Sequence, residues 1–278
     1  MMNPLIRILL FFLATQLLGL YAGVFIIEDA KGNEIVREMV SVQQDAAILP
    51  LFIAYMLVGA AIFLLIIKLR ITFLFALLEF MVISVTSSIL FYAFLRPFIP
   101  ETAFAMAAAM LAGISLAAAK HFFTQLKNSA AILSSAGAGA VFGFTFNFMA
   151  SLIIFFIMAI YDYIAVFRTK HMVSMAKEII KKEMSFTVTA REKLPSGKES
   201  RLDLGTGDLA LPVMVQVAAY QIHPLLAFAT MAGATAGVSF VLVYAWRKKV
   251  FLPAIPFIFS GIMVSVLTAF LLTILKLL

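Results

Sequence analysis

Two aspartates lie in long apolar stretches of the sequence, where an acidic side chain is costly and needs a reason to be present. Asp162 is in FIMAIYDYIAVFRTK, and Asp208 ends a Gly-x-Gly-Asp sequence in RLDLGTGDLALP. Two carboxyl groups close together in an apolar environment do not both ionise easily, so such a pair shares a proton. This arrangement suits hydrolysis: the ionised acid takes a proton from water while the protonated acid polarises a carbonyl.

The same two residues suit a second role equally well. Intramembrane acids also carry protons or bind cations in transporters and channels, and some only neutralise a nearby Lys or Arg. The apolar stretches around Asp162 and Asp208 contain no Lys or Arg, which argues against simple neutralisation. The residues alone therefore leave a protease and an ion-coupled transporter or channel open.

Composition indicates the environment in which these acids work. The chain is 64% hydrophobic and 13% charged, against roughly half and a quarter in soluble domains. Its apolar blocks run for about 20 residues, the length that an α-helix needs to cross a hydrocarbon core about 30 Å thick. We expect an all-α integral membrane protein, most simply of the cell membrane, with the lipid bilayer as its surroundings.

We expect nine transmembrane helices, numbered in chain order. Their approximate ranges are 4–27, 46–67, 71–94, 103–119, 128–146, 147–167, 204–222, 225–245 and 251–275. The fifth and sixth ranges are nearly continuous. The chain then divides into the first six helices in 1–167, a loop in 168–203 and the last three helices in 204–278.

The distribution of basic residues predicts the orientation, because cytoplasmic loops collect Lys and Arg. With a cytoplasmic amino terminus and an external carboxyl terminus, 17 of the 21 Lys and Arg lie inside. The net charge of +7 is thus explained by the membrane and does not indicate a nucleic-acid partner. Asp162 lies five residues before the end of the sixth helix at Phe167, and Asp208 lies four residues after Leu204. Both acids are then expected roughly 6–9 Å below the same cytoplasmic boundary.

The loop 168–203 contains a pattern of its own. SFTVTA, residues 185–190, alternates polar and apolar side chains as a strand does. LPSGKES supplies turn residues, and 201–204 is the candidate returning strand. Because a lone two-stranded hairpin is marginal in water, a flexible basic loop remains an alternative. If a hairpin forms, 185–190 or 201–204 could hold an extended peptide by β-augmentation.

Three short motifs together resemble those of a known family. They are Tyr161-Asp162, Gly205-Thr206-Gly207-Asp208 and Pro253-Ala254-Ile255. They are similar to the YD, GxGD and Pro-Ala-Leu motifs of presenilins and signal peptide peptidases, the intramembrane aspartyl proteases. Ile255 stands where the family has Leu, which changes branching rather than polarity. The predicted topology matches presenilins, and the short loops are most similar to those of compact archaeal presenilin homologues.

The resemblance implies a function and a set of site residues. It implies an endopeptidase that cleaves transmembrane-helix proteins, with Asp162 and Asp208 as the catalytic pair and with no metal or cofactor. It places Tyr161, Leu204 and Thr206 at the site, lets Gly205 and Gly207 admit a close backbone because they have no Cβ, and makes Pro253, Ala254 and Ile255 a wall that faces substrate. A homo-oligomer is left open.

Other chemistries lack their residues. The chain has no Cys and no His-Glu-x-x-His, and its histidines lie at different span ends, at His121, His171 and His223. Small-residue pairs, Gly19/Gly23, Gly139/Gly143 and Gly233/Gly237, predict close helix packing. Glu79, the third acid within a predicted span, has no assigned role.

Overall fold

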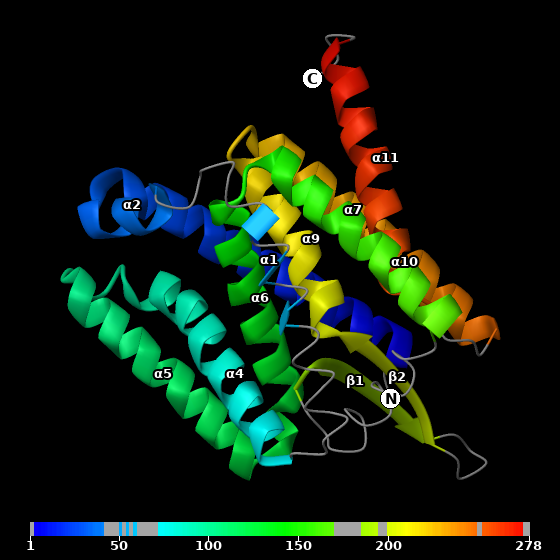
Figure 1. Cartoon of the computed structure of the whole chain (residues 1–278), viewed down its shortest axis with the longest axis horizontal. Helices are drawn as coiled ribbons and strands as arrows, with labels where there is room; N and C mark the ends of the chain where they lie inside the picture. The colour runs from blue at the N-terminus through cyan, green and yellow to red at the C-terminus, as the bar shows by residue number, and fades with distance from the viewer. Residues whose placement is uncertain are drawn as a thin grey trace.

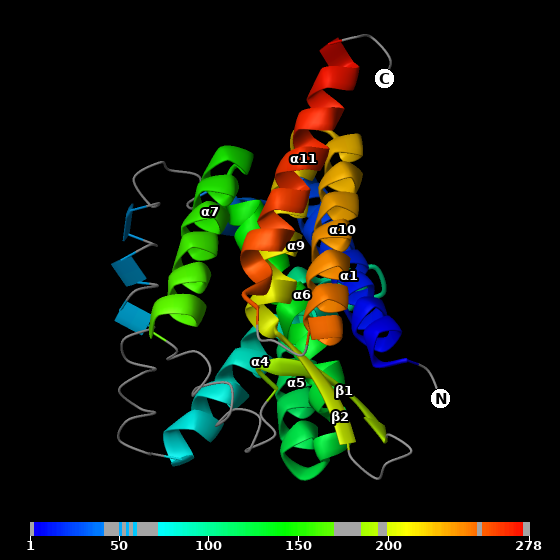
Figure 2. The same cartoon turned by 90° about the vertical axis from the view of Figure 1, so that its right-hand side faces the viewer.

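A computed structural model describes residues 3–41, 50–51, 54–55, 58–59, 72–169, 185–193, 199–248 and 252–274. Most of the second predicted span, 46–67, lies outside these residues. Helices dominate the described chain, and a single hairpin lies at one end of the bundle (Figures 1 and 2).

The helices follow the apolar blocks closely. They are α1 (Pro4–Gly32), α2 (Glu34–Ser41), α4 (Thr72–Leu95), α5 (Thr102–Phe122), η1 (Thr124–Leu126), α6 (Lys127–Thr145), α7 (Phe148–Ile164), η2 (Ala165–Thr169), α9 (Thr206–Tyr220), α10 (Pro224–Lys248) and α11 (Ala254–Ile274). Among the described residues, six helical segments are long and apolar enough to cross a membrane: Pro4–Gly32, Phe73–Leu95, Thr102–Phe122, Phe148–Phe167, Pro224–Lys248 and Ala254–Leu272. A largely helical protein with several candidate membrane spans is therefore confirmed, while the total of nine and the orientation stay predictions.

The break between the fifth and sixth predicted helices is real. α6 ends at Thr145 and α7 begins at Phe148. Asn147 caps the new helix, because its side-chain oxygen accepts the N–H of Ala150 at 2.8 Å. The two apolar ranges therefore form separate helices.

α9 lies against both α1 and α6 (Figure 1), and glycines allow the close approach. A Cβ on Gly139 of α6 would lie 2.5 Å from Cβ of Val213 in α9, and one on Gly143 would lie 2.5 Å from Cβ of Val217. Gly19 and Gly23 of α1 meet the same two valines. The predicted close packing at these small-residue pairs is confirmed, and a similar contact joins Gly233 and Gly237 of α10 to α11.

The segment 185–205 forms a hairpin rather than a flexible loop in its described part. β1 (Thr187–Lys193) pairs antiparallel with β2 (Glu199–Gly205), with Val188 opposite Leu204 and Thr189 opposite Asp203. Val188 is fully buried and Leu204 is 3% exposed, so one face of the hairpin packs into the protein.

Polar side chains from three helices hold this hairpin, and we call them the hairpin anchors: Glu79 of α4, Lys120 of α5, and Lys127 and Asn128 of α6. Glu79 accepts hydrogen bonds from the Lys120 ammonium and from the backbone N–H of Ser185. Asn128 bonds the backbone of Thr189 twice, accepting from its N–H and donating to its carbonyl, each at 2.9 Å. Lys127 donates to the Thr189 hydroxyl at 3.0 Å. These contacts explain how a hairpin that is marginal alone is stabilised, and they explain why Glu79 lies within an apolar helix.

The prediction that the seventh helix begins at Leu204 is wrong. Leu204 belongs to β2, and Gly205 has an extended backbone with φ −68° and ψ 149°. The helix begins at Thr206 because the Asp208 side chain turns back to accept the N–H of Gly205, as a residue at the third helical position does in a capping box. Strand and helix therefore meet at the Gly-x-Gly-Asp sequence.

Candidate active site

Asp162 lies near the end of α7, where the α-helix gives way to the π-helical turn η2. It is 4% exposed, and its Oδ2 accepts a hydrogen bond from the backbone N–H of Ile255 at 3.3 Å. Ile255 is the second residue of α11, where backbone N–H groups have no partner inside their own helix. The start of α11 therefore offers its free donors to the carboxyl of Asp162.

The Pro253-Ala254-Ile255 motif explains why α11 begins at this point. Pro253 has no backbone N–H and its ring fixes φ, so it is tolerated at a helix start and not in the middle of a helix. Ala254 and Ile255 are buried beside it, at 9% and 4% exposed. The motif thus places a helix amino terminus at Asp162.

Asp208 is the third residue of α9, and its own turn holds it. Its Oδ2 accepts the Gly205 N–H at 3.1 Å. A Cβ on Gly205 would lie 3.2 Å from that same oxygen, tighter than most real contacts, so glycine lets the carboxyl close onto the backbone. A Cβ on Gly207 would meet nothing within 4 Å. The first glycine of the motif leaves room for the position of the Asp208 carboxyl, whereas a Cβ at the second would lie in open space.

The tertiary structure brings the two acids together. Asp162 and Asp208 are on α7 and α9, which contact each other, and their two carboxyl groups interact electrostatically. Each carboxyl also accepts one backbone N–H, from Ile255 and from Gly205. All three sequence motifs therefore meet at one pair of carboxyl groups.

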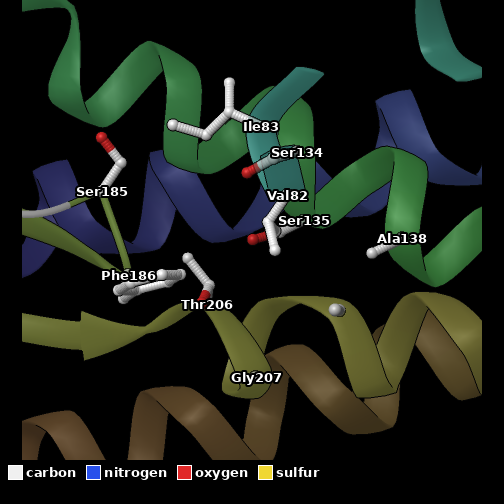
Figure 3. A pocket seen from close by; sticks show the side chains of 10 residues that line it. Val82, Ile83, Ser134, Ser135, Ala138, Ser185, Phe186, Thr206 and Gly207 are labelled. Carbon is white, nitrogen blue, oxygen red and sulfur yellow. The ribbon is translucent and has the colours of Figure 1, made fainter. Parts of the chain in front are cut away.

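The other expected site residues lie around this pair in different ways. Tyr161 is 41% exposed on α7, and Leu204 is buried in the hairpin, where it faces Val188. Thr206 and Gly207 line a cavity together with residues of α4 and α6 (Figure 3). A role of Tyr161 and Leu204 at the carboxyl pair therefore stays a prediction.

That cavity was not predicted from the sequence. It has a volume of about 180 Å³ and lies between α4, α6, the start of the hairpin and α9 (Figure 3). Its lining residues are Val82, Ile83, Ser134, Ser135, Ala138, Ser185, Phe186, Thr206, Gly207 and Ala210. The hydroxyl of Ser135 is buried and has no hydrogen-bond partner among the described residues. The adjacent serines in an otherwise small and apolar helix are the sequence signal that could have indicated it.

A metal would need further ligands. Within the part of the chain that the structure describes, no group of three or more His, Asp or Glu side chains could hold a metal ion.

A bundle of apolar helices that brings two carboxyls together near a helix start has the organisation of a polytopic membrane protein with an aspartic site. The family model for signal-peptide peptidase, presenilin aspartyl protease matches residues 11–275. The chain belongs to this family.

Solved structures support the fold. The chain is similar to a presenilin family intramembrane aspartate protease solved in space group C222, with a TM-score of 0.66 and 20% identity over 96% of this chain and 98% of that one. A structure titled in the same way but in space group P2 gives a TM-score of 0.61 and 21% identity over 93% and 96% of the two chains. No curated protein matches the chain.

Proposed function

We propose that this protein is an intramembrane aspartic endopeptidase in which Asp162 and Asp208 form the catalytic pair. The observation that carries the proposal is the interaction of the two carboxyl groups between α7 and α9, where Asp162 accepts the N–H of Ile255 from another motif and Asp208 accepts the N–H of Gly205 from its own. Membership of an aspartyl protease family favours hydrolysis over the transport of protons or cations.

The pair would act as acid and base on a peptide bond and a water molecule. The ionised carboxyl takes a proton from water, whose oxygen attacks the scissile carbonyl carbon, while the protonated carboxyl gives its proton to the carbonyl oxygen. The resulting diol collapses when the first carboxyl gives its newly gained proton to the amide nitrogen, the C–N bond breaks and the second carboxyl, now ionised, takes a proton from a diol hydroxyl. The backbone donors at Ile255 and Gly205 hold each carboxyl in position throughout.

A substrate helix must unwind before this reaction, because its peptide bonds are buried in its own hydrogen bonds. We propose that the unwound segment pairs with β2 and not with β1. The backbone of Thr189 in β1 is already bonded to Asn128, so this position of β1 is occupied. Asp203 lies directly opposite Thr189. Because the backbone groups of Thr189 bond Asn128, the two residues form a non-hydrogen-bonded pair, in which the N–H and carbonyl of Asp203 also point away from the partner strand. A strand added there would run beside the residues that lead into Asp208.

The wider setting follows from the charge distribution. We propose nine spans with a cytoplasmic amino terminus, which puts Asp162, Asp208 and the hairpin on the cytoplasmic side of a cell membrane. Transmembrane-helix proteins in the same bilayer are the proposed substrates.

The test uses the purified protein in lipid vesicles with a transmembrane peptide. Asp162→Asn and Asp208→Asn each keep the shape of the side chain and remove its acid function, so cleavage should be lost in both. Asp29→Asn changes another largely buried acid, which bonds Tyr92 and pairs with Arg96, and should retain cleavage. Persistent cleavage in either dyad variant would refute the proposal. Aspartate-dependent proton flux without hydrolysis would favour a transporter.

The dependence of cleavage on pH gives a second test. A pair that shares one proton is active only between the loss of that proton and the gain of a second one, so the rate should fall at both low and high pH. A profile that rises or falls in one direction only would contradict a shared proton.

A further inference from the structure

Helix α1 contributes a buried amide to the helix that carries Asp208. The Nε2 of Gln16 donates to the backbone carbonyl of Leu209 at 3.1 Å. Leu209 directly follows Asp208, although Gln16 is 193 residues away in sequence. Gln216 of α9 donates from its Nε2 to the Oε1 of Gln16, and both glutamines are fully buried.

The orientation of the two amides follows from their partners. A carbonyl oxygen only accepts, so the nitrogen of Gln16 must face Leu209 and its oxygen must face Gln216. This leaves the Oε1 of Gln216 without a hydrogen-bond partner among the described residues. The unpaired Oε1 of Gln216 therefore lowers the stability of the folded protein.

The bonded carbonyl lies in a weakened part of α9. Pro212 is inside this helix, and it has no N–H to donate to the carbonyl of Asp208 four residues earlier. Its ring also crowds that carbonyl, which is why a helix bends or loosens at an internal proline. The turn between Asp208 and Pro212 therefore has fewer internal restraints than the rest of α9.

The packing of α1 against α9 does not require the side-chain amides of Gln16 and Gln216. Gly19 and Gly23 already bring the backbone of α1 against Val213 and Val217 of α9. Apolar packing of this kind holds helices together, whereas a hydrogen bond adds a preferred distance and angle to one particular atom. A bond to one particular carbonyl defines the height and rotation of the first turn of α9.

We propose that Gln16 is a positioning residue that fixes this first turn, so that the carboxyl of Asp208 meets that of Asp162. The inference rests on the proposed function and extends it to a residue outside the three motifs. Gln16 does not touch the reacting atoms; it acts through Leu209 on the neighbouring Asp208.

The test compares three variants, because methionine matches glutamine closely in length and shape. Gln216→Met keeps the bond from Gln16 to Leu209 and moves the unpaired oxygen from Gln216 to Gln16, whose Oε1 loses its donor. Gln16→Met/Gln216→Met removes the bond and leaves no unpaired amide, so its Tm should equal or exceed that of wild type. Thr15→Val is the matched control on the same turn of α1, because its hydroxyl bonds only within α1, to Phe11.

We expect Thr15→Val to keep wild-type kcat and Gln216→Met to keep most of it. In the double variant kcat should fall about tenfold or more, because small displacements of a catalytic group are costly. The KM for a transmembrane peptide should not change, since substrate docking is untouched. Affinity for an inhibitor with a hydroxyl in place of the scissile carbonyl should fall in parallel with kcat.

Equal kcat in Gln216→Met and the double variant would overturn the inference. It would leave the catalytic proposal standing, because that proposal is tested by Asp208→Asn. If the double variant does not fold, Gln16→Asn replaces it: the amide is kept, but one methylene less draws it away from Leu209. The same loss of kcat is then expected, and wild-type kcat would again overturn the role of Gln16.

Discussion

The helix that carries Asp208 and the hairpin that leads into it are held in place by different kinds of contact. Around α9, the glycines of α1 and α6 let these helices contact α9 through its backbone and its valine side chains. Around the hairpin, Glu79 and Asn128 make directed polar contacts to Ser185 and Thr189, and Lys120 pairs with Glu79. One region depends on the absence of side-chain volume and the other on charged and amide groups.

The difference matches the surroundings of each region. Helices in a bilayer gain little from hydrophobic burial against each other, so close packing of small residues has to supply their association. A two-stranded hairpin has too few apolar contacts of its own and needs partners that restrain it. The Gly-x-Gly-Asp sequence joins the two regions, so Asp208 depends on both.

The largest effect is expected where a buried charge loses its partner. Glu79→Met leaves the Lys120 ammonium, in a side chain only 12% exposed, without its carboxylate. The free energy of unfolding should fall by about 3–5 kcal/mol, measured by thermal or denaturant unfolding in detergent. Glu79→Met/Lys120→Met should recover most of the lost unfolding free energy. The part that is not recovered measures the lost hydrogen bond between Glu79 and the Ser185 N–H. A double variant as unstable as the single one would contradict the ion-pair explanation.

Added volume should break the other region. Gly139→Ala places a methyl 2.5 Å from Cβ of Val213 and 2.6 Å from the carbonyl of Ala210. Because one neighbour is backbone, relief requires α6 and α9 to move apart, with an expected loss of about 1–3 kcal/mol. Gly207→Ala is the control, since its methyl meets nothing within 4 Å. Equal Tm for Gly139→Ala and wild type would show that the contact is not tight.

A smaller loss is expected from the amide at the hairpin. Asn128→Ala removes two hydrogen bonds to Thr189, at about 1 kcal/mol each, so about 1–2 kcal/mol of unfolding free energy. Asn128→Asp keeps the acceptor for the Thr189 N–H and loses only the donor, so it should lie between Ala and wild type. Hydrogen exchange of the Thr189 amide should rise in the Ala variant. Unchanged protection would contradict the role of Asn128.

The smallest effect on stability and a clear effect on activity are expected at the junction of the two regions. Gly205→Ala puts a methyl 3.2 Å from the Asp208 carboxyl and should change Tm little. It should lower kcat about tenfold, because the carboxyl must shift. Gly207→Ala has free space and serves as the comparison for folding. Full activity in Gly205→Ala would show that Asp208 tolerates the displacement.

Much of the architecture follows from the sequence for simple physical reasons. A span needs about 20 apolar residues, so helices such as α5 and α10 could be predicted to within a few residues of their ends. Asp162 and Asp208 stand out because an acid is costly in an apolar helix. The break before Asn147 and the close packing at Gly139 and Gly143 were also readable.

The start of α9 was less accessible to sequence reasoning. Leu204 was the last residue of the predicted strand 201–204 and the first of the predicted helix, and its pairing with Val188 assigns it to β2. Pairing with a strand depends on where β1 lies, and β1 is held by residues of other helices. An apolar residue at such a boundary suits both structures, so local pattern alone does not decide between them.

The sequence by itself determined the membrane environment, most helix positions and the identity of the two acids, because each follows from local length, polarity and motif. Only the tertiary structure decided that Ile255 bonds Asp162, that Glu79 holds Ser185 and that Gln16 reaches Leu209. The last two pairs are 106 and 193 residues apart. A polar residue in an apolar stretch can be recognised in the sequence because its burial is unfavourable. Its hydrogen-bond partner cannot, because the partner depends on how helices distant in sequence pack together.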